Sequence, residues 1–268
     1  MIVRGTTRLM AIIGHPVRQV RSPDLLNAEL ARRGVDAVLV PMDVAPGDLG
    51  RFVALARAWR NAAGFVVTVP HKRAVAAMVD ALSPRAQRLG AVNLVLRDAE
   101  GRLAGDHLDG IGFLGAARAH GVEPRGRSAL VIGVGGAGSA IADALCEAGV
   151  ARLALRDPDA ARLDQVRGML RAAFPQVALT DDPGTLAGFD LVVNASPVGM
   201  GGTGALPVPP EQIGTLRPGT HVADVVTDPA VTPFLEAARA RGCTVQAGAE
   251  MVAAQISEFG RCFGLFED

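Results

Sequence analysis

The segment from Ser128 to Leu145 constrains the fold of this chain more than any other stretch. It reads "SALVIGVGGAGSAIADAL", an apolar run followed by a glycine-rich turn and a helical pattern. A G-x-G-x-x-G spacing after a strand lets the backbone turn tightly and approach a pyrophosphate at the helix N-terminus. We therefore predict a dinucleotide site, rather than a glycine-rich turn without a ligand, at Gly133, Gly135, Gly136, Ala137 and Gly138.

An acidic residue ends the next apolar run and bears on the choice of cofactor. Asp157 follows Gly138 by 19 residues, a position from which a carboxylate can bind both hydroxyls of the adenosine ribose. A carboxylate there repels the 2′-phosphate of NADP, so the sequence favours NAD. NADP stays possible because Arg156 and Arg162 are close by in the chain and either could reach a phosphate.

Short apolar runs alternate with helical patterns along the whole chain, and the alternation restarts near Gly126. This pattern predicts an α/β protein of two domains with a cleft between them, built on parallel sheets covered by helices on both faces. We also predict a hairpin around Asp98–Gly101 and an N-cap at Ser22.

Composition excludes several classes of partner. The 27 basic and 27 acidic residues balance, which argues against a nucleic-acid or membrane surface as the main partner. The first apolar run is too short for a signal-peptide core and no apolar run reaches the length of a membrane span, so we expect a cytoplasmic protein. The five histidines and three cysteines show no metal-ligand spacing, and we predict no metal site.

Lys72 is the only lysine among the 27 basic residues, at the end of the apolar run "GFVVTVPHK". Arginine keeps its charge at any accessible pH, whereas a desolvated lysine can lose its proton and act as a base. The alternative interpretation is that one lysine survived by chance in an arginine-biased composition.

Six segments resemble motifs of the shikimate dehydrogenase family, in the family's order and across nearly the whole chain. They are "VVTVPHK" (Val66–Lys72), "GAVNL" (Gly90–Leu94), "HLDG" (His107–Gly110), "NASPVGM" (Asn194–Met200), "VTDPAVTPFL" (Val226–Leu235) and "GAEMVAAQ" (Gly248–Gln255).

This resemblance implies a substrate-binding domain over 1–108 with the C-terminal helix 248–268, and a Rossmann-type domain over 109–247. It also implies reversible hydride transfer between a ring hydroxyl of shikimate, quinate or a close ring hydroxy acid and a nicotinamide cofactor. It implies Lys72 as the proton-transfer group with Asp109 as its partner. Oxidising a secondary alcohol requires a base for the hydroxyl proton, which a lysine can supply. The resemblance further implies substrate contacts at Ser22, Thr68, Asn93 and Gln255, and cofactor contacts at Asn194, Ser196, Met200, Val226 and Gly248.

Several positions depart from the family's pattern, and most replace a polar group by an aliphatic one. Val20 stands where the family has a serine and Val66 where it has an asparagine, while Leu108 and Thr227 replace a threonine and a tyrosine. Alternatives therefore stay open: the same chemistry on a less polar ring, a non-catalytic dinucleotide-binding regulatory protein, or a folate-type dehydrogenase. We expect a small-molecule ligand and a monomer or homodimer.

Overall fold

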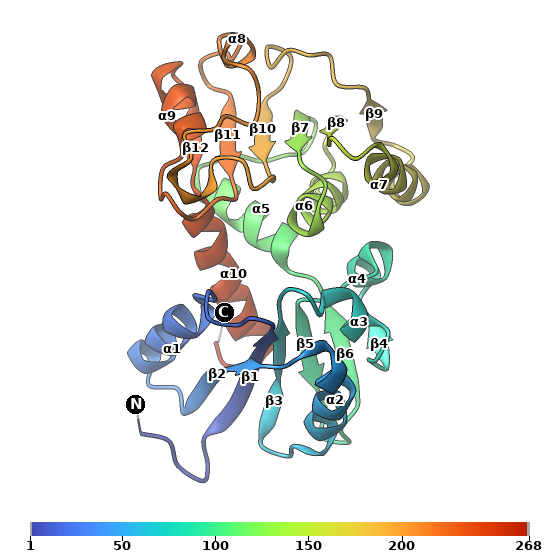
Figure 1. The fold of residues 1–268 in the computed structure, drawn as a ribbon, viewed down its shortest axis with the longest axis vertical. Helices are drawn as coiled ribbons and strands as arrows, with labels where there is room; N and C mark the ends of the chain where they lie inside the picture. Colours follow the sequence, from blue (N-terminus) through green and yellow to red (C-terminus); the bar gives the residue numbers. More distant parts are fainter. Residues whose placement is uncertain (1, 267–268) are drawn as a thin grey trace. The chain divides into compact units, whose positions relative to one another are not determined.

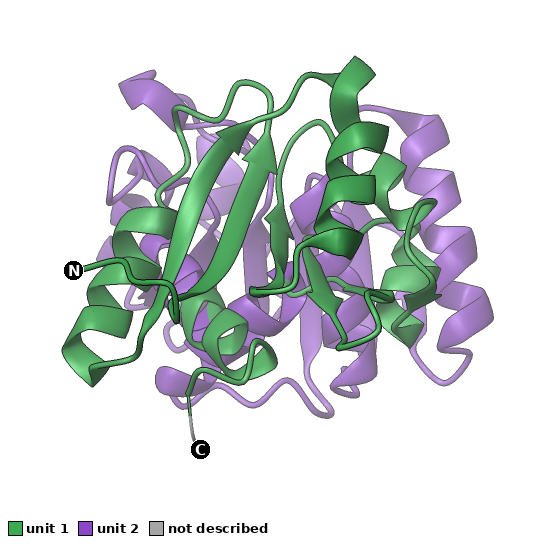
Figure 2. Cartoon of the chain, turned by 90° about the horizontal axis from the view of Figure 1, so that it is seen from below, with its two compact units in different colours: residues 1–108, 255–268 green, residues 109–254 purple. Residues whose placement is uncertain are grey.

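The computed structural model describes residues 2–266 and divides the chain into two compact units. Unit 1 comprises Met1–Leu108 and Gln255–Asp268, and unit 2 comprises Asp109–Ala254, as the colours of Figure 2 show. Among the residues described, no helix is both long and apolar enough to cross a bilayer.

Unit 1 is built on a six-stranded sheet with the order β2-β1-β3-β5-β6-β4. Its strands are β1 (Arg8–Gly14), β2 (Ala37–Asp43), β3 (Ala62–Val67), β4 (Ala81–Leu82), β5 (Leu94–Arg97) and β6 (Leu103–Asp106). Strands β1, β2 and β3 are parallel, whereas β5 is antiparallel to both of its neighbours. The predicted hairpin is confirmed as β5–β6, but it makes the sheet mixed rather than parallel because a short turn can join only antiparallel strands.

The helices of unit 1 follow its strands along the chain. They are α1 (Ser22–Arg33), the 3₁₀ turn η1 (Pro46–Asp48), α2 (Leu49–Ala58), α3 (Lys72–Ala76), α4 (Pro84–Leu89) and the second half of α10 (Gly248–Cys262). The N-cap prediction is wrong by one residue: Arg21 precedes the helix with angles near the helical region (φ −102°, ψ −12°) and Ser22 is already helical. No side chain caps this end, so the Ser22 hydroxyl is not used there.

Helix α3 is shorter than the sequence pattern indicates. The pattern "HKRAVAAMVDAL" predicts one helix over 71–82, but α3 ends at Ala76 and β4 follows. The reason lies in the tertiary structure, where the Asp80 amide donates to the Leu103 carbonyl at 2.8 Å and the Leu103 amide donates to the Asp80 carboxylate at 2.7 Å. These two bonds draw the segment into the sheet beside β6.

Unit 2 carries a second six-stranded sheet with the order β12-β11-β10-β7-β8-β9, in which every pairing is parallel. Figure 1 shows these strands side by side, from β12 at one edge to β9 at the other. The strands are β7 (Ser128–Ile132), β8 (Arg152–Arg156), β9 (Ala178–Thr180), β10 (Leu191–Asn194), β11 (His221–Asp224) and β12 (Thr244–Gln246). This order is the one typical of dinucleotide-binding sheets, with its reversal point between β7 and β10.

Helices cover both faces of the unit 2 sheet. Along β7, Ala129 and Val131 join the cluster formed with α5 (Asp109–Ala119), α6 (Gly136–Glu147) and α7 (Ala160–Ala173). The intervening Leu130 and Ile132 join a cluster that includes α9 (Pro233–Ala240). Alternate residues of a strand point to opposite faces, and both faces are covered here, which explains why β7 is apolar from Ala129 to Ile132. The short α8 (Pro210–Ile213) and the 3₁₀ turn η2 (Met200–Gly202) lie between β10 and β11 in the chain.

Candidate functional site

The glycine-rich turn after β7 has the geometry of a phosphate-binding turn. Gly133 has φ +86°, and a Cβ atom placed on it would lie 2.8 Å from the Ser196 amide nitrogen. A Cβ atom on Gly138 would lie 1.8 Å from the Gly133 carbonyl oxygen, so α6 packs directly on the turn. By contrast, a Cβ atom on Gly136 would meet nothing within 4 Å. The fold therefore requires glycine at the first and third motif positions.

The start of α6 leaves backbone amides available for an anion. The helix begins at Gly136 after Gly135, and no side chain caps this end. The first amides of a helix have no partner within it, and the helix dipole favours negative charge there. The turn lies where β7 ends, beside β10, which is the reversal point at which open parallel sheets bind ligands.

Asn194, at the end of β10, organises the loop that follows. It is fully buried, and its amide nitrogen donates to the Val198 carbonyl at 3.1 Å and to Asp224 at 3.0 Å. Its side-chain oxygen accepts from the Ser196 hydroxyl at 2.6 Å. These bonds hold the Ser196–Met200 segment beside the Gly133 turn, so the predicted cofactor residues at 133–138 and 194–196 lie at one edge of the sheet.

Asp224, at the end of β11, accepts several hydrogen bonds that hold the neighbouring loops, a role that the sequence pattern does not reveal. Its carboxylate accepts from Asn194, from the Val226 amide at 3.0 Å and from the Thr232 hydroxyl at 2.7 Å. Burial raises the pKa of this carboxyl, although its hydrogen bonds act in the opposite direction. Next to it, α10 begins at Gly248, where a Cβ atom would lie 2.5 Å from the Val226 carbonyl. The structure thus brings Val226 and Gly248 together, whereas Met200 lies in the exposed turn η2.

Asp157, at the end of β8, does not face outward as a ribose ligand would. Its carboxylate accepts from the Val134 amide at 2.8 Å and from the Asp159 amide at 2.9 Å, and its side chain is only 2% exposed. Burial opposes ionisation of this carboxyl, but the two amides and Arg162 outweigh burial and lower its pKa. The carboxylate is therefore used to close the turn, while the Arg162 guanidinium, 3.4 Å from it, is 47% exposed.

In unit 1, three of the predicted site residues lie at one edge of the sheet. Thr68 follows the end of β3, and its amide donates to the Ile13 carbonyl at 2.9 Å. Asn93 precedes β5, and its carbonyl accepts from the Val67 amide at 2.9 Å. Lys72 opens α3, and its carbonyl accepts from the Val92 amide at 3.0 Å. The backbone therefore gathers Thr68, Lys72 and Asn93 where β3 ends.

The backbone hydrogen bonds around the end of β3 do not include the other predicted substrate and catalytic residues. Ser22 is the first residue of α1, Gln255 is in the middle of α10 and Asp109 opens α5. Lys72 belongs to unit 1 and Asp109 to unit 2, so their pairing stays a prediction.

Asp106, at the end of β6, stabilises the end of the unit 1 sheet where Thr68, Lys72 and Asn93 gather. This role was not predicted from the sequence. Arg85 donates to both carboxylate oxygens at 2.8 and 2.5 Å, and the Ser83 hydroxyl donates to one of them. The Asp106 carbonyl accepts from the Asn93 amide at 2.9 Å. Burial opposes ionisation of Asp106, but the bonds from Arg85 and Ser83 outweigh burial and lower its pKa. A signal was present in the acidic residue that precedes the "HLDG" segment.

We expect Asp106→Asn to destabilise the protein by about 1–3 kcal/mol at pH 7, since a charge-assisted bond to Arg85 is lost. A carboxyl whose pKa is lowered by folding stabilises the native state above its ordinary value of 3.8 and loses that contribution as the pH falls through the folded value. The difference in unfolding free energy between wild type and variant, measured by urea denaturation, should therefore shrink below about pH 4. The exposed Asp24 provides the control, and an Asp106→Asn variant as stable as Asp24→Asn at pH 7 would contradict the assignment.

Comparison with known proteins agrees with this geometry. Residues 12–95 match the family described as "Shikimate dehydrogenase substrate binding domain". Shikimate dehydrogenase (NADP(+)) of Rubrobacter xylanophilus is 42% identical, over 97% of this chain and 92% of the relative. The chain belongs to the shikimate dehydrogenase family.

Two solved structures resemble this chain over nearly its whole length. The structure of shikimate 5-dehydrogenase from Listeria monocytogenes, in complex with shikimate and NAD, has a TM-score of 0.92 at 28% identity, covering 99% of this chain and 94% of that one. The ligand-free 5-ketofructose reductase of Gluconobacter sp. strain CHM43 has a TM-score of 0.90 at 30% identity, covering 96% and 92%. The expected fold class, a substrate domain followed by a Rossmann-type domain, is confirmed.

The expectation that NAD is favoured is wrong. Curated relatives from Rubrobacter xylanophilus, Citrifermentans bemidjiense and Acidiphilium cryptum, 40–42% identical, are named as NADP(+) enzymes. The physical reason is the orientation of Asp157, whose carboxylate is taken up by the Val134 and Asp159 amides. The Asp157 carboxylate keeps its negative charge, but these amides and the Arg162 guanidinium face that charge and reduce the repulsion on which the expectation depended.

Proposed function

We propose that this protein catalyses reversible hydride transfer between a ring hydroxyl of shikimate, or a close ring hydroxy acid such as quinate, and NADP. The observation that carries the proposal is the gathering of Thr68, Lys72 and Asn93 at the end of β3, in a chain of this family. We further propose that the protein acts in the cytoplasm as a monomer or homodimer.

The residues of unit 2 fit a dinucleotide. The amides at the start of α6 would hold the pyrophosphate, and the Ser196–Met200 loop, which Asn194 positions, would hold the nicotinamide end. Bound NADP would supply the acceptor for the hydride that leaves the ring carbon. Lys72 takes the hydroxyl proton as the hydride leaves and returns it in the reverse direction, and Asp109 holds the ammonium group in place. Ser22, Thr68, Asn93 and Gln255 orient the ring by hydrogen bonds.

The test is a steady-state assay of nicotinamide reduction with shikimate, quinate and related ring acids, each with NADP⁺ and NAD⁺. We expect shikimate with NADP⁺ to give the highest kcat/KM of the panel. An absence of turnover with every ring acid, in a protein that still binds NADP⁺, would instead support the non-catalytic dinucleotide-binding alternative.

Arg162→Gln should raise the KM for NADP⁺ by about 10–100-fold and leave kcat little changed. The reason is the loss of a charge-assisted hydrogen bond to the 2′-phosphate, which contributes about 1.5–3 kcal/mol. Kinetics with NAD⁺, which lacks that phosphate, should be nearly unaffected. Arg171→Gln is the matched control because Arg171 is an exposed arginine on the same helix, α7. Equal KM values for NADP⁺ in the two variants would refute the assignment.

A second candidate is the same chemistry on a substrate without the carboxylate of shikimate. Val20 is half-buried and lies in the segment of chain between β1 and α1. It stands where the family has a serine in the motif that binds the substrate carboxylate. Val66 lies inside β3 opposite Leu94 and is 3% exposed. Its side chain therefore packs in the core and is not available to the substrate. The similarity to 5-ketofructose reductase favours this candidate. Testing this candidate requires keto sugars in the substrate panel. If shikimate gave the highest kcat/KM, the candidate would be rejected.

A further inference from the structure

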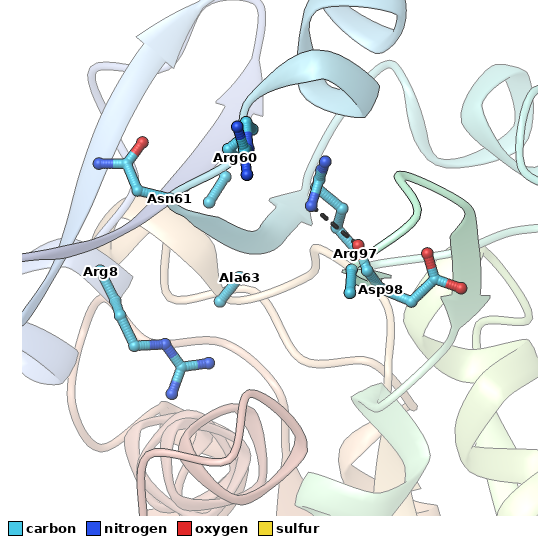
Figure 3. Close-up of a pocket in the computed structure, with 8 residues that line it drawn as sticks. Arg8, Arg60, Asn61, Ala63, Arg97 and Asp98 are labelled. Atoms are coloured by element: carbon cyan, nitrogen blue, oxygen red, sulfur yellow. Dashed lines mark hydrogen bonds between the residues drawn. The ribbon is translucent and has the colours of Figure 1, made fainter.

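Unit 1 contains a pocket at the end of its sheet opposite to the gathered site residues. The pocket has a volume of about 230 Å³ and is lined by Arg8 at the start of β1, Arg60 and Asn61 before β3, and Arg97 at the end of β5. Figure 3 shows Arg8, Arg60 and Arg97 around Ala63. Three arginines thus contribute to the lining of one small pocket.

Among residues 2–266, none of these arginines forms an ion pair with an acidic side chain. Arg8 donates to the carbonyls of Phe263 at 2.8 Å and Gly264 at 3.2 Å. Arg97 donates to the Arg57 carbonyl at 2.8 and 3.0 Å and to the Asp98 carbonyl at 2.8 Å. These acceptors are neutral, so they position the guanidinium groups without cancelling their charge. Within residues 2–266, Arg60 forms no hydrogen bond or ion pair and is exposed.

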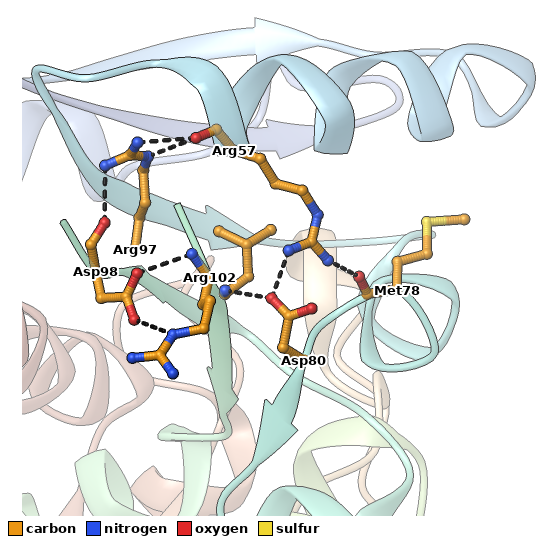
Figure 4. Close-up of polar contacts among 7 residues, drawn as sticks. Arg57, Met78, Asp80, Arg97, Asp98 and Arg102 are labelled. Carbon is orange, nitrogen blue, oxygen red and sulfur yellow. Dashed lines mark hydrogen bonds and ion pairs between the residues drawn. The ribbon is translucent and has the colours of Figure 1, made fainter. Parts of the chain in front are cut away.

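The single carboxylate among the lining residues is already paired. Asp98 accepts from the Arg102 guanidinium at 2.7 Å and from the Arg102 amide at 2.8 Å, on the side away from Arg97 (Figure 4). Among the described residues, the three arginines that line the pocket therefore have no unpaired carboxylate beside them in its lining.

A neighbouring pocket shows the contrast. It has a volume of about 430 Å³ and is lined by Asp80, Arg97, Asp98 and Arg102. Here the acids are matched, because Arg57 pairs with Asp80 and Arg102 pairs with Asp98 (Figure 4). Arg97 lines both pockets, but Arg8 and Arg60 line only the smaller one, which has three arginines against one carboxylate among its lining residues.

We propose that the pocket lined by Arg8, Arg60 and Arg97 binds a small dianion, of the class of inorganic phosphate or a phosphate monoester. Guanidinium groups match the geometry of phosphate oxygens and bind them through charge-assisted hydrogen bonds. A water molecule occupies about 30 Å³ in the liquid, so the pocket has room for several non-hydrogen atoms, but it is smaller than the sites of drug-sized ligands.

The site is distinct from the proposed active site. Strand β3 runs from the pocket at Ala62 to Val67, just before Thr68, and β5 runs back from Asn93 to Arg97. Six residues of extended chain span about 20 Å, which separates the two ends of the sheet. The dianion therefore binds at the far ends of the two strands that position Thr68 and Asn93.

The test is isothermal titration of the full chain, at low ionic strength, with inorganic phosphate in one arm and glycerol 3-phosphate in another. Glycerol serves as the uncharged control ligand. We expect Arg60→Gln to weaken binding by about tenfold or more, since it removes one charged donor. Arg51→Gln is the matched control because Arg51 is an exposed arginine on α2 that pairs only with Asp48 and carries the same charge change. Tighter binding of glycerol 3-phosphate than of phosphate would identify a monoester site, and the reverse a phosphate site.

A second pair of variants separates this pocket from the nucleotide site. Phosphate could also bind near Arg162, so Arg162→Gln is titrated in parallel. Binding that is lost in Arg162→Gln and unchanged in Arg60→Gln would overturn the proposal, as would the absence of phosphate binding in the wild type. Arg97→Gln, checked for folding by circular dichroism, should weaken binding as Arg60→Gln does.

Discussion

Replacing Lys72 with alanine is expected to lower kcat by about 10²–10⁴-fold, the range typical of a positioned general acid–base group. Binding of NADP⁺, followed by titration calorimetry, should stay nearly unchanged, because the predicted nucleotide contacts all lie in unit 2. The effect is large because no other lysine exists in the chain to take over the proton transfer.

Two further variants separate proton transfer from charge. Lys72→Arg retains the positive charge but cannot release a proton, so it should be nearly as inactive as Lys72→Ala. Arg73→Ala removes the neighbouring exposed basic residue and should keep most of the wild-type kcat. Activity in Lys72→Arg above one tenth of the wild-type value would show that Lys72 serves as a fixed charge, and the proposed role would be wrong.

Gly138→Ala should destabilise the protein by about 1–3 kcal/mol or more and abolish nucleotide binding. The added Cβ atom would lie 1.8 Å from the Gly133 carbonyl, so α6 has to move away from the turn that cradles the phosphates. Thermal unfolding without nucleotide measures the first effect, and calorimetric titration with NADP⁺ measures the second.

Gly136→Ala is the matched control, only two residues away. A Cβ atom at Gly136 meets nothing within 4 Å, and alanine is a better helix former than glycine by about 1 kcal/mol. This variant should be as stable as the wild type or slightly more so. If the two variants unfold at the same temperature, the close packing of α6 on the turn does not limit stability.

Local patterns in the sequence were sufficient for much of the fold. The turn at Gly133–Gly138, the hairpin of β5 and β6 and the restart of the strand–helix alternation are all present in the structure. These features depend on neighbouring residues, because glycine spacing, turn residues and the period of apolar positions act within a few residues of chain. Helix α3 is an exception. Its helical pattern continues beyond Ala76, but Asp80 forms two hydrogen bonds with Leu103, more than 20 residues away, and the helix ends early.

The sequence by itself determined the α/β class, the position of the glycine-rich turn and the single lysine, Lys72, shortly after β3. Only the tertiary structure decided which way the polar side chains point. Asp157 was predicted to meet the ribose, yet the Val134 amide, from a strand–turn 23 residues earlier, holds its carboxylate inside. The same holds for the pocket of Arg8, Arg60 and Arg97, which no local pattern reveals. Side-chain orientation depends on donors and acceptors brought together by strand pairing, and a linear pattern does not contain those distances.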